Sequence, residues 1–247
     1  MVYSGKIYET DGAAPVAVHE ADAVRPLAPI PHAPSLRIFR SDLQGSPFGD
    51  DPAEPRFFYA NPGCLVGASQ LITYPEFVDA LGFVPMVAAI LVGDAYQVST
   101  EDADDLILGV TILNMLVAKD RERAEIQAGA IGSSHDFGAV IGPVITTPDE
   151  LEDHVIDALR GRRLSLSAVA RVNGVERLRG NLADLPFTFA EAISAASQTC
   201  TLKSGDIIAL GPIATSEGGP VVLGPGDEVQ LAIENLGAIA LKLTLQQ

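Results

Sequence analysis

Lys119 and Asp120 close the apolar stretch "GVTILNMLVAKD" (residues 109–120), and Lys119 is the first candidate for chemistry. A lysine ammonium can bind the oxygen of an enolate or a carboxylate, and a lysine with a depressed pKa can form a Schiff base with a carbonyl. The alternative is an ion pair with Asp120 or Glu122, because acids at such short spacings lie within reach. Lys119 is therefore a candidate catalytic residue with a structural alternative.

His135 and Asp136 form a second candidate pair, in the segment "GSSHDFG". An imidazole titrates near neutral pH, and an adjacent carboxylate can fix its tautomer, so this pair could act in proton transfer. The alternative is that His135 is an exposed loop residue. His19, His32 and His154 have no partners at ligand spacing, and we assign them no role.

Composition limits the classes of function. Apolar residues make up 47% of the 247 residues and charged residues 19%, which is typical of a globular protein. The net charge of −16 repels phosphate backbones and anionic lipid headgroups, so we expect no binding to nucleic acid or to membranes. Cys64 and Cys200 lack metal-ligand spacing and are expected to be reduced and packed as small apolar groups. The N-terminal segment "MVYSGKIYETDG" has no targeting pattern, and a cytoplasmic location is expected.

Several segments predict the elements that must position these residues. Proline-rich segments before residue 60 predict short strands joined by loops, and "FVPMVAAILVGD" (residues 83–94) predicts a strand buried on both faces. Acids after Ser99 and Thr100 predict a helix start, and Thr147 with Pro148 predicts another. We expect a hairpin turn at Asn173-Gly174, a helix within residues 187–202, and apolar strands in residues 205–212 and 226–245. The fold class predicted from these elements is α+β with a dominant sheet.

Five segments, in order, resemble motifs of the fumarylacetoacetate hydrolase family. They are "EPRFFYANPGCLVG", "GVTILNMLVAKD", "GSSHDFGAVIGPVITTPDEL", "TLKSGDIIALGP" and "LGPGDEVQLAIENLGAIALKL". The resemblance implies a mixed, rolled β-sandwich domain over residues 61–247, with the active site in its mouth. It also implies a small N-terminal domain or lid region over residues 1–60, and a homodimer.

The resemblance further implies a divalent metal held by three carboxylates, beside a His-Glu pair that activates water. The aligned ligand positions hold Pro85, Val87 and Met115, none of which offers an oxygen ligand to a hard cation. Lys119 stands at the position of a family arginine, and "SLRIFRSDLQGSPF" (residues 35–48) has no counterpart to the His-Glu motif. We therefore expect a divergent member that binds no metal and uses no other cofactor.

The aligned motifs also supply the candidate site. The catalytic candidates are Lys119, His135 and Asp136, and the candidates for substrate binding are Tyr59, Met115, Glu122, Ser133, Ser134 and Val87. An apolar mouth with a few polar groups favours an apolar or polyketide-like small molecule.

Two functions remain open at this stage. The first is a metal-independent, non-hydrolytic enzyme of the cyclase or cycloaddition, isomerase or carbon–carbon lyase type. Such an enzyme would act on a dicarbonyl, enol or polyketide-like intermediate, in a biosynthetic pathway of secondary metabolism. The alternative is a catalytically inactive binding protein or a partner subunit.

Overall fold

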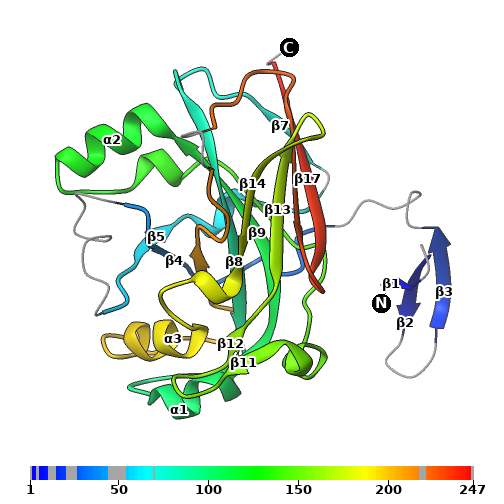
Figure 1. Cartoon of the computed structure of the whole chain (residues 1–247), viewed down its shortest axis with the longest axis vertical. Helices are drawn as coiled ribbons and strands as arrows, with labels where there is room; N and C mark the ends of the chain where they lie inside the picture. Colours follow the sequence, from blue (N-terminus) through cyan, green and yellow to red (C-terminus); the bar gives the residue numbers. More distant parts are fainter. Residues whose placement is uncertain are drawn as a thin grey trace.

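A computed structural model describes residues 2–3, 6–10, 15–20, 27–43, 54–68, 70–216 and 221–245 of the chain. Two large β-sheets form the main body, and short helices lie at its edges (Figure 1). The α-helices are α1 (Thr100–Ala103), α2 (Lys119–Gln127) and α3 (Phe189–Ser197). No helix in the described part of the chain is both long and apolar enough to cross a membrane.

The larger sheet has seven strands in the order β5-β4-β15-β8-β9-β10-β6. Its strands are β4 (Leu36–Arg40), β5 (Phe58–Ala60), β6 (Leu65–Val66), β8 (Leu81–Leu91), β9 (Ile107–Ala118), β10 (Ala139–Ile141) and β15 (Ile207–Gly211). β15 pairs with β4 in parallel, and β10 pairs with β6 in parallel, whereas the other neighbours are antiparallel. The sheet is therefore mixed.

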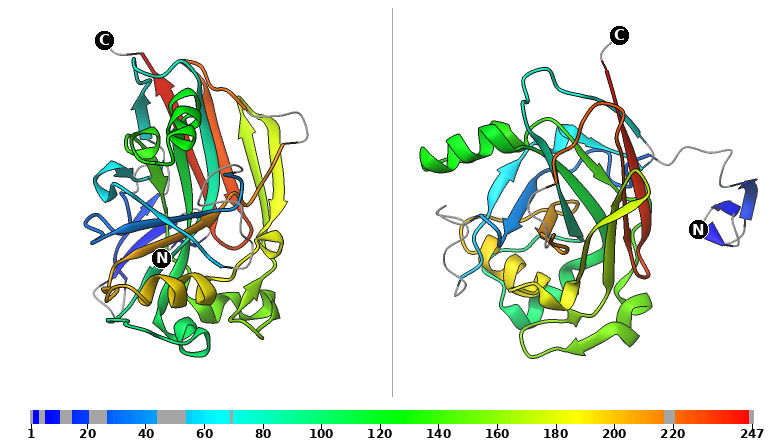
Figure 2. Two further views of the ribbon diagram at one scale, coloured as in Figure 1. Left: turned by 90° about the vertical axis from the view of Figure 1, so that its left-hand side faces the viewer. Right: turned by 45° about the horizontal axis from the view of Figure 1, so that its top comes forward.

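The second large sheet has five strands in the order β14-β13-β16-β17-β7. Its strands are β7 (Gln70–Thr73), β13 (Ser167–Val172), β14 (Val175–Asn181), β16 (Glu228–Ile233) and β17 (Gly237–Thr244). The described residues also form two small, separate sheets. One consists of β11 (Val155–Asp157) and β12 (Arg163–Leu164), and the other of β1 (Val2–Tyr3), β2 (Lys6–Thr10) and β3 (Pro15–Glu20). Figure 2 shows the two large sheets curling around a shared interior.

Short 3₁₀ helices connect these strands. They are η2 (Pro62–Cys64), η3 (Asp104–Leu106), η4 (Ser133–His135), η5 (Pro148–His154) and η6 (Leu182–Asp184). Among them, η4 carries three of the candidate site residues, Ser133, Ser134 and His135, of which Ser134 and His135 are buried.

Two apolar cores cover the two faces of the seven-stranded sheet. One contains Val87 and Ile112 together with Ala168 and Leu231 of the five-stranded sheet, so it lies between the sheets. The other lies on the opposite face and includes Met115. Because both faces are covered, every residue of β8 is buried. The prediction of a strand buried on both faces is confirmed, and so is the α+β class with its mixed, rolled sandwich.

Most of the predicted elements after residue 80 form. The turn at Asn173-Gly174 joins β13 to β14 with both residues at positive φ, and α3 begins with a capping box between Thr188 and Glu191. Ser99 caps a helix as predicted, but α1 has only four residues. The apolar residues that follow form β9, because this segment pairs with both β8 and β10 in the sheet.

The proposed boundary at residue 60 remains a prediction. Among the described residues before it, β4 and β5 are strands of the seven-stranded sheet, with β4 paired to β15. The remaining described strands before the boundary, β1 to β3, pair with one another. Residues 44–53 of the proposed N-terminal domain or lid region lie outside the described residues.

Candidate functional site

A cleft of about 660 Å³ opens where several strands of the larger sheet end. β4 ends at Arg40, β9 at Ala118 and β15 at Gly211, while β8 begins at Leu81, so the loops and first residues beyond these points meet at one edge. The cleft is lined mostly by apolar groups, with two charged and two hydroxyl side chains: Asp42, Phe83, Val84, Pro85, Lys119, Leu178, Pro212, Ala214, Thr215, Ser216 and Val221. Such a lining is typical of a small-molecule site.

Lys119, the first residue of α2, is held at this cleft by an ion pair. Its Nζ lies 3.0 Å from Oε2 of Glu122, one turn further along α2. The aliphatic stem of Lys119 packs over Gly82, where an added Cβ would lie 2.9 Å from the lysine Cε. The ion-pair alternative for Lys119 is therefore confirmed with Glu122, and Lys119 is also one of the residues that line the cleft. The side chain is 23% exposed.

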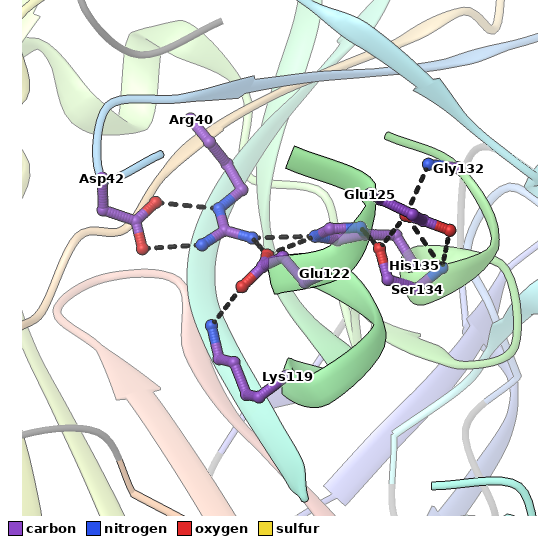
Figure 3. A network of polar contacts seen from close by, with 8 residues as sticks. All are labelled: Arg40, Asp42, Lys119, Glu122, Glu125, Gly132, Ser134 and His135. Atoms are coloured by element: carbon purple, nitrogen blue, oxygen red, sulfur yellow. Dashed lines mark hydrogen bonds and ion pairs between the residues drawn. The ribbon is translucent and has the colours of Figure 1, made fainter. Parts of the chain in front are cut away.

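Arg40 contacts Asp42, which lines the cleft, and also the buried residues Glu122 and His135 (Figure 3). Its side chain is 1% exposed, and Nε and Nη2 donate to the two oxygens of Asp42 at 2.8 and 2.6 Å. Nη1 lies 2.5 Å from Glu122 Oε1 and 2.8 Å from His135 Nε2. Arg40 therefore fixes the carboxylates of both Asp42 and Glu122, and a planar guanidinium suits this because its donors lie in a rigid fork.

Behind Glu122 the polar contacts continue through His135 and Ser134 to Glu125 (Figure 3). Glu125 Oε2 lies 2.5 Å from Ser134 Oγ, and that hydroxyl lies 2.8 Å from His135 Nδ1. A serine hydroxyl carries one hydrogen, which it gives to the carboxylate, so we assign the proton on the ring to Nδ1. In the neutral ring Nε2 then accepts from Arg40, and on protonation it donates to Glu122, 3.0 Å away.

The network fixes the charges beside the cleft. Burial works to raise the pKa of Glu122, but the contacts with His135, Arg40 and Lys119 outweigh it and lower that pKa well below 4.5. Burial lowers the pKa of His135 below 6.5, and Arg40 adds to this against the opposing effect of Glu122. At neutral pH Glu122 is charged and His135 is neutral. Two cations, Arg40 and Lys119, then face two anions, Asp42 and Glu122.

The structure brings together part of the predicted site. Lys119, Glu122, Ser134 and His135 belong to one network, and His135 is fully buried. Ser133 is exposed and joins through Glu125, to which its hydroxyl donates at 2.7 Å. Asp136, expected to orient His135, is exposed, and the carboxylate that contacts the imidazole is that of Glu122. Asp136 follows η4 in a position where its side chain is exposed, whereas Glu122 of α2 lies next to the imidazole ring of His135.

The other predicted binding residues lie elsewhere. Tyr59 is 57% exposed on β5, beside the Arg37 guanidinium rather than in the cleft lining. Val87 and Met115 are both fully buried in the middle of the sheet. They belong to the two different apolar cores, so they face opposite sides of the sheet. The expected single pocket lined by both residues does not form, because alternate positions of a pleated sheet point to opposite faces.

The metal implied by the resemblance does not fit these residues. Of the three aligned ligand positions, Pro85 lines the cleft without any side-chain donor, and Val87 and Met115 lie within the two cores. No group of three His, Cys, Asp or Glu residues in the described ranges could hold a metal ion. Hard cations need several oxygen ligands, and the residues at these positions offer none from their side chains.

Three residues of the network were missed in the sequence: Arg40, Asp42 and Glu125. The segment around Arg40 has no counterpart to the His-Glu motif of the family, so the resemblance gave its residues no role. A pattern in this segment could still have indicated the site. Arg40 occupies the next alternate position after the apolar residues Leu36 and Ile38, and an acid, Asp42, follows two residues later. A buried arginine requires acid partners, so Asp42 was one that the sequence offered.

Comparison with known proteins places this chain in a family. The sequence profile described as "Fumarylacetoacetate (FAA) hydrolase C-terminal" matches residues 36–244, which cover most of the chain and both large sheets. The chain belongs to this family. The resemblance found in the sequence is thereby confirmed, whereas the absence of metal ligands in a divergent member remains a prediction.

Relatives within the family include isomerising enzymes. The oxaloacetate tautomerase YisK of Bacillus subtilis is 29% identical over 195 residues, which cover 77% of this chain and 62% of that protein. The 4-hydroxyphenylacetate degradation bifunctional isomerase/decarboxylase of Escherichia coli is 26% identical over 90% of this chain and 49% of its own length. This chain therefore spans less than two thirds of either relative.

A solved structure shows the same fold. The crystal structure of 2-hydroxyhepta-2,4-diene-1,7-dioate isomerase from Mycobacterium marinum superposes with a TM-score of 0.74 at 23% identity. The match covers 94% of this chain and 82% of that chain. At this level of identity the likeness establishes the fold.

Proposed function

We propose that this protein is a metal-independent, non-hydrolytic enzyme that catalyses keto–enol isomerisation of a small carbonyl acid in the cleft lined by Lys119 and Asp42. The observation that carries the proposal is the ammonium of Lys119 at the cleft, held by Glu122, whose carboxylate is buried and is bound by the buried Arg40. The names of the two relatives support isomerisation and give no support to cyclisation, cycloaddition or a role in secondary metabolism.

Lys119 would stabilise the negative charge that develops on the substrate oxygen. An ammonium carries three hydrogens, and the contact with Glu122 uses one of them. The others can donate to an enolate oxygen in the cleft. Because Glu122 is itself held by Arg40 and His135, the ammonium needs little reorganisation as charge develops. A fixed donor of this kind contributes a factor of about 10²–10³ to the rate.

Asp42 is the carboxylate that lines the same cleft and is proposed as the proton acceptor. It takes the proton from the carbon next to the carbonyl, the electron pair of that C–H bond forms the C=C bond, and the π pair of the carbonyl moves to its oxygen. Lys119 gives a proton to the enolate oxygen to form the enol. Water in the cleft then returns a proton to Lys119 and receives the one held by Asp42, which restores both groups.

His135 acts as a positioning residue in this proposal. Its ring is fully buried between Arg40, Glu122 and Ser134, so it orients the groups that hold Lys119 instead of touching the substrate. Ser134 and Glu125 support the ring from behind. Asp136 and Tyr59 have no part in the reaction as proposed.

The test follows the enol absorbance of phenylpyruvate and oxaloacetate with protein treated with EDTA. We expect catalysed decay of the enol, and a fall in kcat of about 10²–10³ in Lys119→Met, which keeps the stem and removes the charge. Lys203→Met is the matched control, because Lys203 is an exposed lysine paired with Asp94 away from the cleft lining. Its rate should equal that of the wild type.

Two results would overturn the proposal. The first is a rate in Lys119→Met equal to that of the wild type. The second is activity that EDTA abolishes and a divalent metal restores, which would make the reaction metal-dependent. A third result would favour the alternative function. If folded wild-type protein turns over neither acid but one of them raises its melting temperature, the protein is better described as a catalytically inactive binding protein.

A further inference from the structure

The charges of the cleft restrict which acid can occupy it. We infer that the substrate is a monoanion, with one acidic and enolisable end and an apolar substituent, rather than a dianion such as a dicarboxylate. The inference takes the reaction from the proposed function. The charge of the substrate is inferred from a different observation, the distribution of charged and apolar groups around the cleft.

The cleft offers one accessible cation among the described residues that line it. That cation is Lys119, which is 23% exposed. Arg40 lies close by, but its side chain is 1% exposed and its donors are directed to Asp42, Glu122 and His135. A single carboxylate or enolate can therefore pair with Lys119, and a second carboxylate on the same ligand would find no further cation among the described residues that line the cleft.

Asp42 makes a second carboxylate unfavourable as well as unpaired. Its carboxylate lines the same cleft, and its side chain is 38% exposed. Like charges brought close together in a partly desolvated site repel one another more strongly than in water. The net charge of −16 on the whole chain acts in the same direction, because it lowers the affinity for any more highly charged anion.

The remaining wall suits a hydrocarbon group. Phe83, Pro85, Leu178 and Val221 present apolar side chains, and Pro85 and Pro212 have no backbone N–H to donate to an anion. The volume of about 660 Å³ is larger than a short-chain acid needs and lies in the usual range for ligands that carry a ring or a longer chain. An aromatic or aliphatic substituent would fill this space and displace water from it.

The test compares a monoanion with a dianion of the same reacting class. We expect kcat/KM for the enol of phenylpyruvate to exceed that for oxaloacetate by at least about tenfold. Thr215 is exposed and lines the cleft, so Thr215→Lys adds a second cation without disturbing the core. The ratio should shift toward oxaloacetate by about tenfold in Thr215→Lys and stay unchanged in Thr215→Gln, its uncharged control.

A preference of the wild type for oxaloacetate would overturn the inference and leave the proposed reaction standing. A failure to turn over either acid would overturn the proposed reaction. In that case calorimetry with two unreactive acids, 3-phenylpropanoate and succinate, decides the inference by itself. Tighter binding of 3-phenylpropanoate supports it, and equal or tighter binding of succinate contradicts it.

Discussion

Strand β4 carries two buried arginines with different surroundings, Arg37 and Arg40. They are three residues apart, so they leave opposite faces of the strand. Arg37 pairs with Asp206 at 3.0 Å, and the two side chains are 5% and 3% exposed. It also donates to Ser35 and lies over the rings of Phe57 and Tyr59. Arg40 pairs with Asp42 and Glu122 beside the cleft.

The difference lies in whether the charged groups reach a cavity. Asp206 accepts further hydrogen bonds from Ser35 and from the backbone N–H of Lys203, so the carboxylate that faces Arg37 is fully engaged. The Arg40 network instead ends at two partly exposed groups that line the cleft, Asp42 and Lys119. We therefore interpret the fully buried ion pair of Arg37 as a structural element. We interpret the Arg40 network, which includes residues that line a cleft, as part of a functional site.

The strongest test of this difference between Arg37 and Arg40 is to remove each guanidinium in turn. Arg37→Met and Arg40→Met each leave a carboxylate without its main partner, and we expect each to lower the free energy of unfolding by about 3–5 kcal/mol. Urea unfolding measures this loss. At a temperature where both variants are folded, only Arg40→Met should also lower the rate of enol decay. Equal rates in the two variants would remove the functional distinction.

A smaller effect is expected from Glu122→Gln, which keeps the shape and removes the charge. At pH 7 we expect a loss of about 1.5–3 kcal/mol, the usual contribution of a hydrogen bond to a charged group. The pKa of Glu122 is lowered in the folded state, so its contribution is present above the ordinary carboxyl pKa and is lost as the pH falls below about 4.5.

The pH series makes this prediction specific. Urea midpoints of wild type and Glu122→Gln, measured between pH 7 and pH 3.5, should converge as the pH falls. The lowered pKa of His135 also destabilises the fold on acidification, since the ring must charge in a buried place. Because Glu122 opposes this lowering in the wild type alone, the two proteins are compared in a His135→Gln background, where the ring no longer contributes to the difference. A difference that stays constant over this range would contradict the assignment of a low pKa to Glu122.

The smallest effect tests the far end of the network. Ser134→Ala removes the hydroxyl between Glu125 and His135, and we expect a loss of about 0.5–1.5 kcal/mol, the usual net contribution of a hydrogen bond. Ser133→Ala is the control, because its hydroxyl also binds Glu125 but is exposed. A similar or larger loss in Ser133→Ala would show that the buried hydroxyl has no special part in the network.

The site could be foreseen from the sequence only in part. Lys119 and Glu122 lie one helical turn apart, so their contact follows from local spacing, and the sequence named it as the alternative for Lys119. The contact of Arg40 with Glu122 joins residues 82 positions apart, and no local pattern encodes such a pairing. The sequence also paired His135 with its neighbour Asp136, whereas the imidazole meets a carboxylate from another element.

The sequence by itself determined the family, the α+β class, the double burial of β8 and the turn at Asn173-Gly174. These depend on the order of motifs, on apolar runs and on residues that tolerate positive φ, all of which are local properties. Only the tertiary structure decided that Val87 and Met115 face different cores and that Arg40, Glu122 and His135 meet. The register between strands and the direction in which α2 leaves β9 set these contacts, and both result from packing over the whole sheet.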